Sequence, residues 1–325
     1  MILIRFPHQK DIFTIETTEN NDFSVAFFDF DQQKKVHFSG RKRMATEHDF
    51  LRIEQLFHHK NFHLHAPSTP DDYPTYEEKI KTIKEFLTKE NLPKLVFSRR
   101  KYHFFEDEIS IVASFQKMCN TYPQALVYLF VSEQECWMGG FYEILGKYNK
   151  KNQEFHTMSL AGTLPLNESW TEKEIQEQNT VTQYIKGIIK QYTSDYQISS
   201  LKDAISGNIK HLCTEFSAII NEKEVQNLIH ALHPTPAVCG TPKHLCKKKI
   251  EELETEERKL YSGYIDIASA EEKTCFVNLR CAQIYANGAK IFVGGGINEQ
   301  SHPEKEWLET ELKAEAILKN LVFLR

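Results

Sequence analysis

A hairpin signal near the C-terminus constrains the fold most. Residues 274–285 and 290–293 have the composition of strands, and Asn287-Gly288 lies between them. These two residues tolerate positive φ, which the tight turns of antiparallel hairpins require. Strand-like runs also form a neighbouring pair at 125–131 and 136–141, and helical segments separate such pairs. This order predicts an α+β fold with antiparallel sheets rather than a βαβ alternation.

Helices are predicted where apolar residues recur at helical spacing. The longest follows Thr171, a plausible N-cap with Glu174 at the third helical position, which is a capping-box pattern. The predicted helices cover residues 75–90, 109–118, 170–192, 222–232, 242–262 and 303–318. Shorter strands are predicted at 23–30 and 95–97.

Residues 66–74 form the clearest break in this pattern, because they are rich in proline, serine and aspartate. With 325 residues, of which 41% are hydrophobic, the chain can bury a sizeable core. We expect one domain over residues 1–325. In it, residues 1–74 are an N-terminal part that matches no known pattern, and residues 75–325 are the core that carries the function.

Composition excludes several kinds of partner. The net charge is −5 and no strongly basic stretch is present, so neither nucleic acid nor a membrane surface is expected. No apolar run approaches the roughly 18 residues that span a bilayer, and the start of the chain lacks a signal-peptide layout. The seven cysteines form no Cys-x-x-Cys pair. They are interpreted as reduced, mostly buried thiols, which predicts a cytoplasmic protein.

Two Glu-x-x-Glu pairs suggest a metal site. Glu174 with Glu177, and Glu306 with Glu309, each place two carboxylates on one helix face. If the two faces meet, they form the oxygen-rich pocket that Mg²⁺ prefers. The same spacing recurs within residues 251–257, which have the composition of an ordinary charged helix face. Spacing alone therefore favours a solvated helix face over a metal site.

Three further patterns suit an anionic ligand. Arg280 lies near the end of an apolar strand, where its planar fork can bind a carboxylate through two hydrogen bonds. Lys313 follows Glu309 by four residues, which also fits a surface ion pair. Gly294-Gly295-Gly296 follows a strand, and glycines let backbone N–H groups approach an anion closely. A plain tight turn has the same composition, so none of these patterns identifies a site alone.

The order and spacing of these patterns resemble the chorismate-utilising enzymes, which comprise isochorismate, salicylate, anthranilate and aminodeoxychorismate synthases. The resemblance extends over about residues 94–313. It is carried by His233-Pro234-Thr235-Pro236-Ala237-Val238, Tyr261-Ser262-Gly263, Asn278-Leu279-Arg280, Gly294-Gly295-Gly296-Ile297 and Glu306-Trp307-Leu308-Glu309-Thr310 with Lys313. It implies the fold of anthranilate synthase component I, in which antiparallel β-sheets pack as a sandwich core with helices on the outside.

The resemblance also implies an Mg²⁺ site and chorismate as the small-molecule partner. Glu177 and Glu309 would bind the ion directly, and Glu174 and Glu306 would support it through water. The residues implied to contact the substrate are Ala161, Gly162, Thr163, Thr214, His233, Ala237, Tyr261, Arg280, Gly294, Gly295, Gly296 and Lys313. Of these, Arg280 would bind the enolpyruvyl carboxylate, and Lys313 would lie beside the metal-bound carboxylate.

Three residues discriminate among the reactions of the family. Lys94 opens a Lys-x-x-x-x-Arg segment similar to that of isochorismate and salicylate synthases, where this lysine is the general base for water. Aminodeoxychorismate synthases carry a nucleophilic lysine at the position of Ala161, and alanine disfavours that reaction. Glu143 is implied to be the general acid, because its segment is similar to the family's Gly-Ala-(Ser/Thr)-Pro-Glu-x-Leu. In that segment, Phe141-Tyr142 replaces the usual small residue and proline.

Together these residues predict an isochorismate synthase, an isomerase that adds water at C2 of chorismate and releases the C4 hydroxyl. Lys94 would be the base and Glu143 the acid, so burial has to lower one pKa and raise the other. The product would enter menaquinone or siderophore biosynthesis, and we expect a monomer or a weak homodimer. Asp266, where the family usually has glycine, could place a further carboxylate near the site. Salicylate synthase is the closest alternative, and a non-catalytic chorismate-binding subunit is an alternative of another class.

Overall fold

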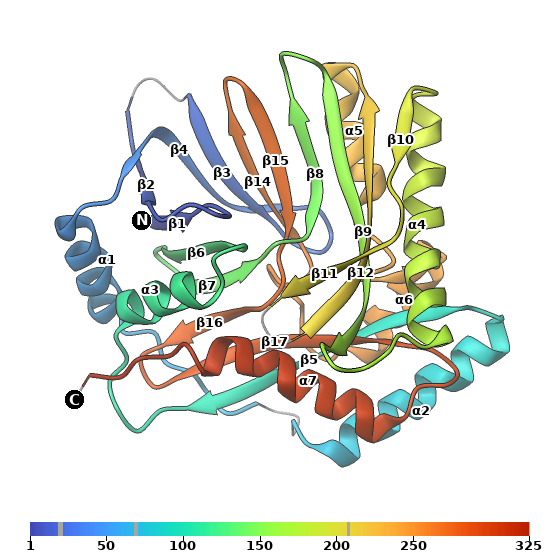
Figure 1. Cartoon of the computed structure of the whole chain (residues 1–325). Helices are drawn as coiled ribbons and strands as arrows, with labels where there is room; N and C mark the ends of the chain where they lie inside the picture. The colour runs from blue at the N-terminus through green and yellow to red at the C-terminus, as the bar shows by residue number, and fades with distance from the viewer. Residues whose placement is uncertain (19–21, 68–70, 207–208, 325) are drawn as a thin grey trace.

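Antiparallel pairing organises the whole chain (Figure 1). The computed structural model describes residues 1–18, 22–67, 71–206 and 209–324. Every strand pair that these residues form is antiparallel. The strands make two sheets that share β4 (Lys34–Met44), since β4 pairs with a strand of each.

The first sheet contains the strand that begins at Lys94 and the predicted hairpin. Its strands are β1 (Ile2–Arg5), β2 (Ile12–Glu16), β5 (Lys94–Phe104), β6 (Leu126–Val131), β7 (Cys136–Phe141), β13 (Gly240–Thr241), β16 (Cys281–Tyr285) and β17 (Gly288–Ile297). They lie in the order β4–β2–β1–β6–β7–β16–β17–β5–β13.

The second sheet packs against the first. Its strands are β3 (Phe23–Phe28), β8 (Ile144–Asn149), β9 (Glu154–Pro165), β10 (Tyr196–Ile198), β11 (Lys202–Ser206), β12 (Ile209–Ile219), β14 (Tyr264–Ser269) and β15 (Glu272–Val277). They lie in the order β4–β3–β14–β15–β8–β9–β12, and both β10 and β11 pair with β12 at the edge.

Helices cover the outer faces of both sheets (Figure 1). They are α1 (Glu47–Lys60), α2 (Tyr73–Glu90), α3 (Ile111–Thr121), α4 (Glu172–Tyr192), α5 (Glu222–Leu232), α6 (Lys243–Leu253) and α7 (Pro303–Leu318). On the first sheet, α1 and α3 contact β6, and α7 contacts β17. On the second, α4 contacts β9 and β12, and α5 contacts β8.

Strand β6 shows how the layers share their apolar residues. Leu129 belongs to the core beneath α1 and α3, whereas its neighbour Phe130 belongs to the core between the sheets. There its ring centroid lies 4.9 Å from that of Phe27 on β3. Because successive strand residues point to opposite faces, a strand buried on both faces has a continuous apolar sequence. The layers confirm the predicted α+β fold, with packed antiparallel sheets and helices outside.

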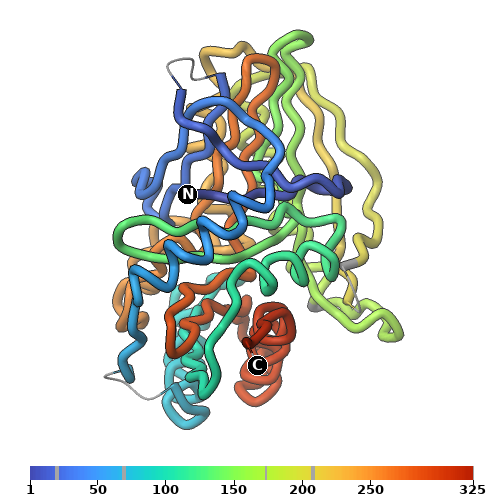
Figure 2. Tube along the Cα trace, turned by 90° about the vertical axis from the view of Figure 1, so that its left-hand side faces the viewer, coloured from blue at the N-terminus to red at the C-terminus, as the bar shows by residue number. Residues whose placement is uncertain are grey.

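The N-terminal strands are built into both sheets. Strand β1 pairs with β6 in the first sheet, and β3 pairs with β14 in the second. Figure 2 shows the blue N-terminal trace running beside the green segment that contains β6. Helix α2 then begins after Asp72, whose side chain accepts from the Thr75 backbone N–H. This helix start lies within the predicted break at 66–74, of which residues 68–70 lie outside the described residues.

The predicted C-terminal hairpin is present, but its turn lies one residue earlier. Tyr285 pairs with Gly288, so the two residues between them form the turn. The Asn287 side chain accepts from the Leu64 N–H at 2.7 Å and donates to the Leu64 carbonyl at 3.0 Å. Gly288 is needed for another reason, since a Cβ there would lie 2.7 Å from the His103 carbonyl oxygen on β5.

Several strand predictions were wrong in extent. The predicted strand 274–285 is two strands, β15 and β16, which belong to different sheets. The chain crosses between the sheets at Asn278-Leu279-Arg280, where Arg280 has a φ of 48°. The predicted strand 95–97 lies near the start of the longer β5. Strands β8, β9 and β12 were not predicted, because polar residues interrupt their apolar positions.

The predicted helix 242–262 was wrong in its second half, because α6 ends at Leu253. Glu254, assigned from sequence to a charged helix face, has a side chain that is only 4% exposed. It accepts hydrogen bonds from the Ser98 backbone N–H at 2.9 Å and from Arg258 Nη2 at 2.6 Å. Because α6 ends before Glu254, the carboxylate of this residue can reach the backbone of β5.

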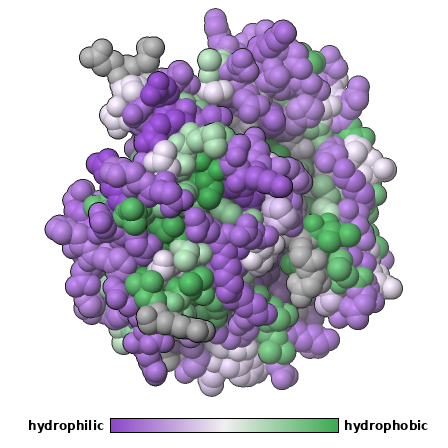
Figure 3. Space-filling model, turned by 60° about the vertical axis from the view of Figure 1, so that its left-hand side comes forward, coloured by the Kyte–Doolittle hydropathy of each residue, from purple (hydrophilic) through white to green (hydrophobic). Residues whose placement is uncertain are grey.

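Polar side chains dominate the face of the molecule in Figure 3, with separate hydrophobic patches between them. Within the described residues, no helix is long and apolar enough to cross a membrane. All seven cysteines are free and buried, in agreement with the prediction from composition.

The Glu254–Arg258 pair links three segments of the chain. Arg258 donates to the carbonyls of Val96 at 2.8 Å and Val238 at 2.7 Å, in addition to Glu254. Burial alone would raise the pKa of Glu254, but the charge and hydrogen bonds of Arg258 hold it below its ordinary value. Removing one partner would leave a buried charge without compensation.

Glu254→Gln is therefore expected to lower the free energy of unfolding at pH 7 by about 3 kcal/mol. Urea unfolding followed by tryptophan fluorescence measures the loss. Glu257→Gln is the matched control, because Glu257 is exposed, and it should change the value by less than about 0.5 kcal/mol. A Glu254→Gln protein as stable as the wild type would contradict the structural role of the pair.

Candidate active site

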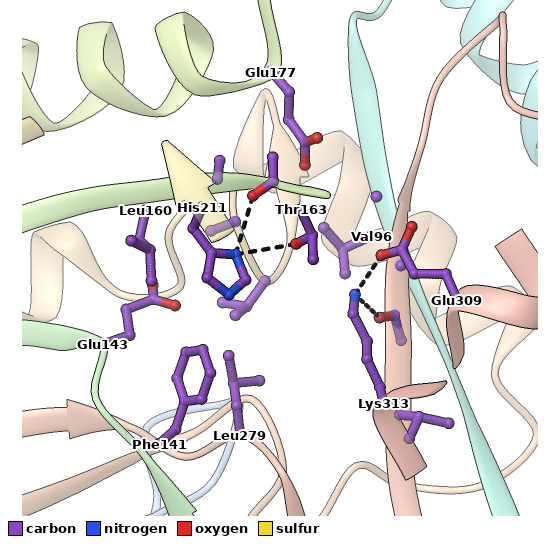
Figure 4. Close-up of a pocket in the computed structure, with 18 of the residues that line it drawn as sticks. Val96, Phe141, Glu143, Leu160, Thr163, Glu177, His211, Leu279, Glu309 and Lys313 are labelled. Atoms are coloured by element: carbon purple, nitrogen blue, oxygen red, sulfur yellow. Dashed lines mark hydrogen bonds and ion pairs between the residues drawn. The ribbon is translucent and has the colours of Figure 1, made fainter. Parts of the chain in front are cut away.

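Most of the residues predicted from sequence line one cleft, which we call the main cleft (Figure 4). It holds about 970 Å³ of space not filled by atoms, mouth included. Both sheets and helices α4 and α7 contribute walls. The predicted residues that line it are Lys94, Glu143, Ala161, Gly162, Thr163, Glu174, Glu177, Ala237, Tyr261, Arg280, Gly294, Gly295, Gly296, Glu309 and Lys313.

Lys94 enters the main cleft from the first position of β5. Its side chain is buried, and Nζ lies 2.5 Å from Glu177 Oε1 on α4. Gly296 on β17 leaves the space that Lys94 fills, because a Cβ there would lie 2.5 Å from Lys94 Cε. The lysine is therefore paired and sterically confined.

Glu143 lies between β7 and β8, and Figure 4 shows its carboxyl group in the main cleft. The residue is 5% exposed. Burial raises the pKa of Glu143 to about 8, although the charge of Lys94 lowers it in part. A carboxyl group with this pKa is mostly protonated at neutral pH, which is the state that a proton donor needs.

Glu177 and Glu309 reach the main cleft from different helices, α4 and α7 (Figure 4). Glu309 Oε1 lies 2.6 Å from Lys313 Nζ, which also donates to the Gly294 carbonyl at 2.9 Å. Burial acts to lower the pKa of Lys313, but Glu309 outweighs it and holds the value above the ordinary one. With Lys94 beside Glu177, each of these two carboxylates has a lysine as its counter-ion.

Of the two supporting glutamates, Glu174 lines the main cleft and Glu306 does not. Glu174 confirms the predicted capping box, since the Thr171 backbone N–H donates to its Oε2 at 3.0 Å. Glu306 was predicted to support the metal, but it is buried behind Gly295 and does not line the cleft. In the described part of the chain, no group of three or more His, Cys, Asp or Glu side chains is placed to hold a metal ion. An ion at Glu177 and Glu309 would need further oxygens from water or a ligand.

Arg280 adds a further positive charge to the lining of the main cleft. Its Cζ lies 5.3 Å from the centroid of the Phe141 ring, and burial lowers the pKa of the guanidinium. The Glu309 carboxylate acts on this guanidinium through charge and opposes part of the lowering of its pKa. A guanidinium whose charged form is disfavoured in this way favours an incoming anion.

The glycine run was predicted to follow a strand, but it continues β17 and pairs with β5. Each glycine makes room for a different side chain. A Cβ on Gly294 would lie 3.0 Å from the Tyr261 hydroxyl, and one on Gly295 would lie 3.3 Å from Glu306 Oε2. These glycines are needed for close packing of polar side chains around the cleft.

Two other predicted residues lie outside the lining. Thr214 is on β12, where Gln178 Nε2 donates to its Oγ1 at 3.4 Å. His233 is fully buried between aromatic rings, 6.4 Å from Phe30 and 5.1 Å from Tyr264 by centroid. Burial lowers the pKa of His233 to about 3, so it is a neutral packing residue.

Asp266 does not reach the main cleft either. Its Oδ2 lies 2.9 Å from Lys273 Nζ on the paired strand β15. Lys273 also donates to Gln226 Oε1 on α5 at 2.6 Å. The carboxylate therefore belongs to the side of the second sheet that faces α5.

His211 is a site residue that sequence reasoning missed. It lines the cleft beside Gly162, and its Nδ1 lies 3.0 Å from the Gly162 carbonyl oxygen and 3.1 Å from Thr163 Oγ1. Burial, and then the charge of Arg280, lower the pKa of His211 to about 4, so the ring is neutral. Since Nδ1 donates to the carbonyl, Nε2 is left as an acceptor, and no described residue binds it.

Strand alternation is the signal that could have found His211. Residues 211 and 214 lie on opposite faces of β12, so only one of them can face the cleft. The remaining unpredicted lining is mostly apolar: Val96, Phe141, Leu160, Val238, Leu279, Phe292 and Val293. Apolar residues of this kind are indistinguishable from ordinary core in a single sequence.

Known proteins share this sequence pattern. The family described as chorismate binding enzyme matches residues 12–322. The isochorismate synthase EntC of Escherichia coli K12 is 33% identical over 151 residues, which cover 46% of this chain and 39% of EntC. The vibriobactin-specific isochorismate synthase of Vibrio cholerae is 26% identical over 260 residues, which cover 75% of this chain and 65% of that protein. The matches thus span less than two thirds of these relatives' own lengths.

Solved structures share the fold. DhbC of Bacillus anthracis superposes with a TM-score of 0.81 at 19% identity, covering 98% of this chain and 95% of DhbC. Anthranilate synthase component I of Streptococcus pneumoniae gives 0.72 at 17% identity, covering 93% and 82%. These likenesses confirm the predicted anthranilate synthase component I-like fold. Since the family match extends over nearly all of the sequence and the fold agrees with it, this chain belongs to the chorismate-binding enzyme family.

Proposed function

We propose that this protein is an isochorismate synthase, an isomerase that converts chorismate into isochorismate. The observation that carries the proposal is that Lys94 and Glu143 line the same buried cleft while Ala161 offers no nucleophile. An amine for proton removal and a protonated carboxyl for proton delivery are what water addition at C2 and loss of the C4 hydroxyl require. The isochorismate synthases among the relatives support the same reaction.

The proposed reaction begins at Lys94. Lys94 takes a proton from water as the oxygen forms a bond to C2. The ring double bonds shift, the bond between C4 and its hydroxyl breaks, and Glu143 gives its proton to the departing oxygen. The raised pKa of Glu143 keeps that proton available at neutral pH.

The substrate has two carboxylates, and the cleft offers a separate place for each. Arg280, which has Phe141 stacked beneath it, suits the enolpyruvyl carboxylate. Lys313 lies beside Glu309 at the other wall and suits the ring carboxylate. The free Nε2 of His211 can accept a hydrogen bond from a substrate hydroxyl.

Mg²⁺ is the proposed cofactor, and the residues present fit it. Glu177 and Glu309 would hold the ion, because they bring two hard carboxylates to one cleft from two helices. Glu174 and Glu306 would support them from behind. When bound, the ion supplies positive charge for the ring carboxylate.

Lys94→Ala is expected to lower isochorismate formation about a hundredfold or more, because the base is removed. Chorismate affinity and urea stability should stay close to the wild type. Coupled turnover assays with chorismate titrations measure both. Lys89→Ala, an exposed lysine in the last turn of α2, is the matched control. Normal turnover by Lys94→Ala would refute the assignment.

The pKa of Glu143 predicts an alkaline limb in the pH profile. Because the acid must be protonated and its pKa is about 8, kcat/KM should fall by about tenfold for each pH unit well above that value. Initial rates between pH 6 and 10 show the limb. Glu143→Gln cannot titrate, so its residual activity should lack the limb. A wild-type profile that stays flat to pH 10 would speak against Glu143 as the acid.

Product analysis with and without metal tests the reaction itself. Pure protein with chorismate and Mg²⁺ should yield isochorismate, and EDTA should abolish the conversion because the ring carboxylate loses its counter-charge. Chromatography separates the products. Salicylate with pyruvate would instead identify a salicylate synthase, and anthranilate on adding ammonia would overturn the role of Lys94. Unconsumed chorismate would indicate a binding subunit.

A further inference from the structure

A second cavity meets the main cleft at Lys94, Glu177 and Gly296, and the two share no other lining residue. It holds about 930 Å³ of space not filled by atoms, mouth included. Its remaining walls come from the loop before β5, from α4 and from the turn after β17. These residues are Asn91, Leu92, Pro93, Gln176, Thr180, Asn298, Glu299 and Gln300.

The boundary between the two cavities is thin. It consists of the Lys94–Glu177 ion pair, with Nζ and Oε1 2.5 Å apart, and the bare backbone of Gly296. A Cβ on Gly296 would lie 3.0 Å from both Lys94 Nζ and Glu177 Oε1. Lys94 therefore lines both cavities, and its amine lies beside the Gly296 backbone that they share.

The walls of the two cavities differ in chemistry. The main cleft has apolar stretches at Phe141, Leu160 and Leu279, and chorismate would fill it during turnover. The second cavity is lined largely by amides and a hydroxyl, including Gln176 and Thr180, and several of its residues are exposed. Water in a protein cavity needs two to four polar partners, and the second cavity offers them outside the space that chorismate would fill.

We propose that this second cavity is a solvent port for the nucleophile. Water reaches Lys94 through the port while chorismate occupies the main cleft. One proton passes from the attacking water to Lys94 and one passes from Glu143 to the departing hydroxyl, so a turnover leaves the number of protons on the enzyme unchanged. The hydroxyl that leaves C4 departs as water with the proton of Glu143. This inference rests on the proposed isochorismate synthase activity and adds to it the route of the water.

The buried natural cysteines make a direct test possible. In Thr180→Cys, position 180 lines the port and would carry an accessible thiol, whereas all seven natural cysteines are buried. Labelling with a methanethiosulfonate that bears a bulky aromatic group would fill the port. We expect kcat to fall about tenfold or more, because water loses its route to Lys94. Chorismate KM and Mg²⁺ affinity should change less than about twofold, and dithiothreitol should restore kcat.

Asn179→Cys is the matched control, because Asn179 is exposed on the same helix and lines neither cavity. Its labelling should leave kcat within about twofold. Gln300→Cys fills the port from the opposite wall and should reproduce the loss if Thr180→Cys folds poorly.

Three results would overturn the port. These are full labelling of Cys at 180 and at 300 with unchanged kcat, an equal loss on labelling position 179, or a loss that appears in chorismate KM alone. The unlabelled proteins keep the two proposals apart. If they make no isochorismate, the proposed function fails and the port with it, whereas active unlabelled protein with an insensitive label refutes the port only.

Discussion

The pairing of β5 with β17 is the constraint on which the site depends. The two strands run side by side from Gly288 opposite Phe104 to Ile297 opposite Leu95. This register brings Lys94 next to Gly296 and places the glycine run along the floor of the main cleft. Since a shift by one residue would turn every side chain to the other face, the register itself decides which residues can react.

The charges of the cleft are arranged around that floor. Lys94 lies against Glu177 and Lys313 against Glu309, so each of these two carboxylates is paired with a lysine. Arg280 lies over the Phe141 ring, and Glu309 acts on its guanidinium through charge. Burial in this cleft is the largest cause of both the raised pKa of Glu143 and the lowered pKa of His211.

Outside the cleft, the buried Glu254–Arg258 pair connects α6 and the segment after it to β5. Glu254 and Arg258 bind the backbone of β5 at Ser98 and Val96, and Arg258 reaches Val238 as well. From its spacing to other acidic residues, Glu254 was predicted to lie on a charged helix face. The spacing cannot show whether the helix continues past Leu253 or ends there. Only the early end of α6 shows that the carboxylate turns inward.

The sequence by itself determined the family, the α+β class, the capping box at Glu174 and most of the residues in the cleft. Those features rest on local spacing, which a linear pattern preserves. The tertiary structure decided which of the predicted site residues line the same cleft. It placed Thr214 and His233 outside the lining, moved Asp266 to the side of α5, and brought His211 into the cleft. The physical reason is that strand register and the crossing at Asn278-Leu279-Arg280 set the direction of each side chain, and both depend on partners far away in the chain.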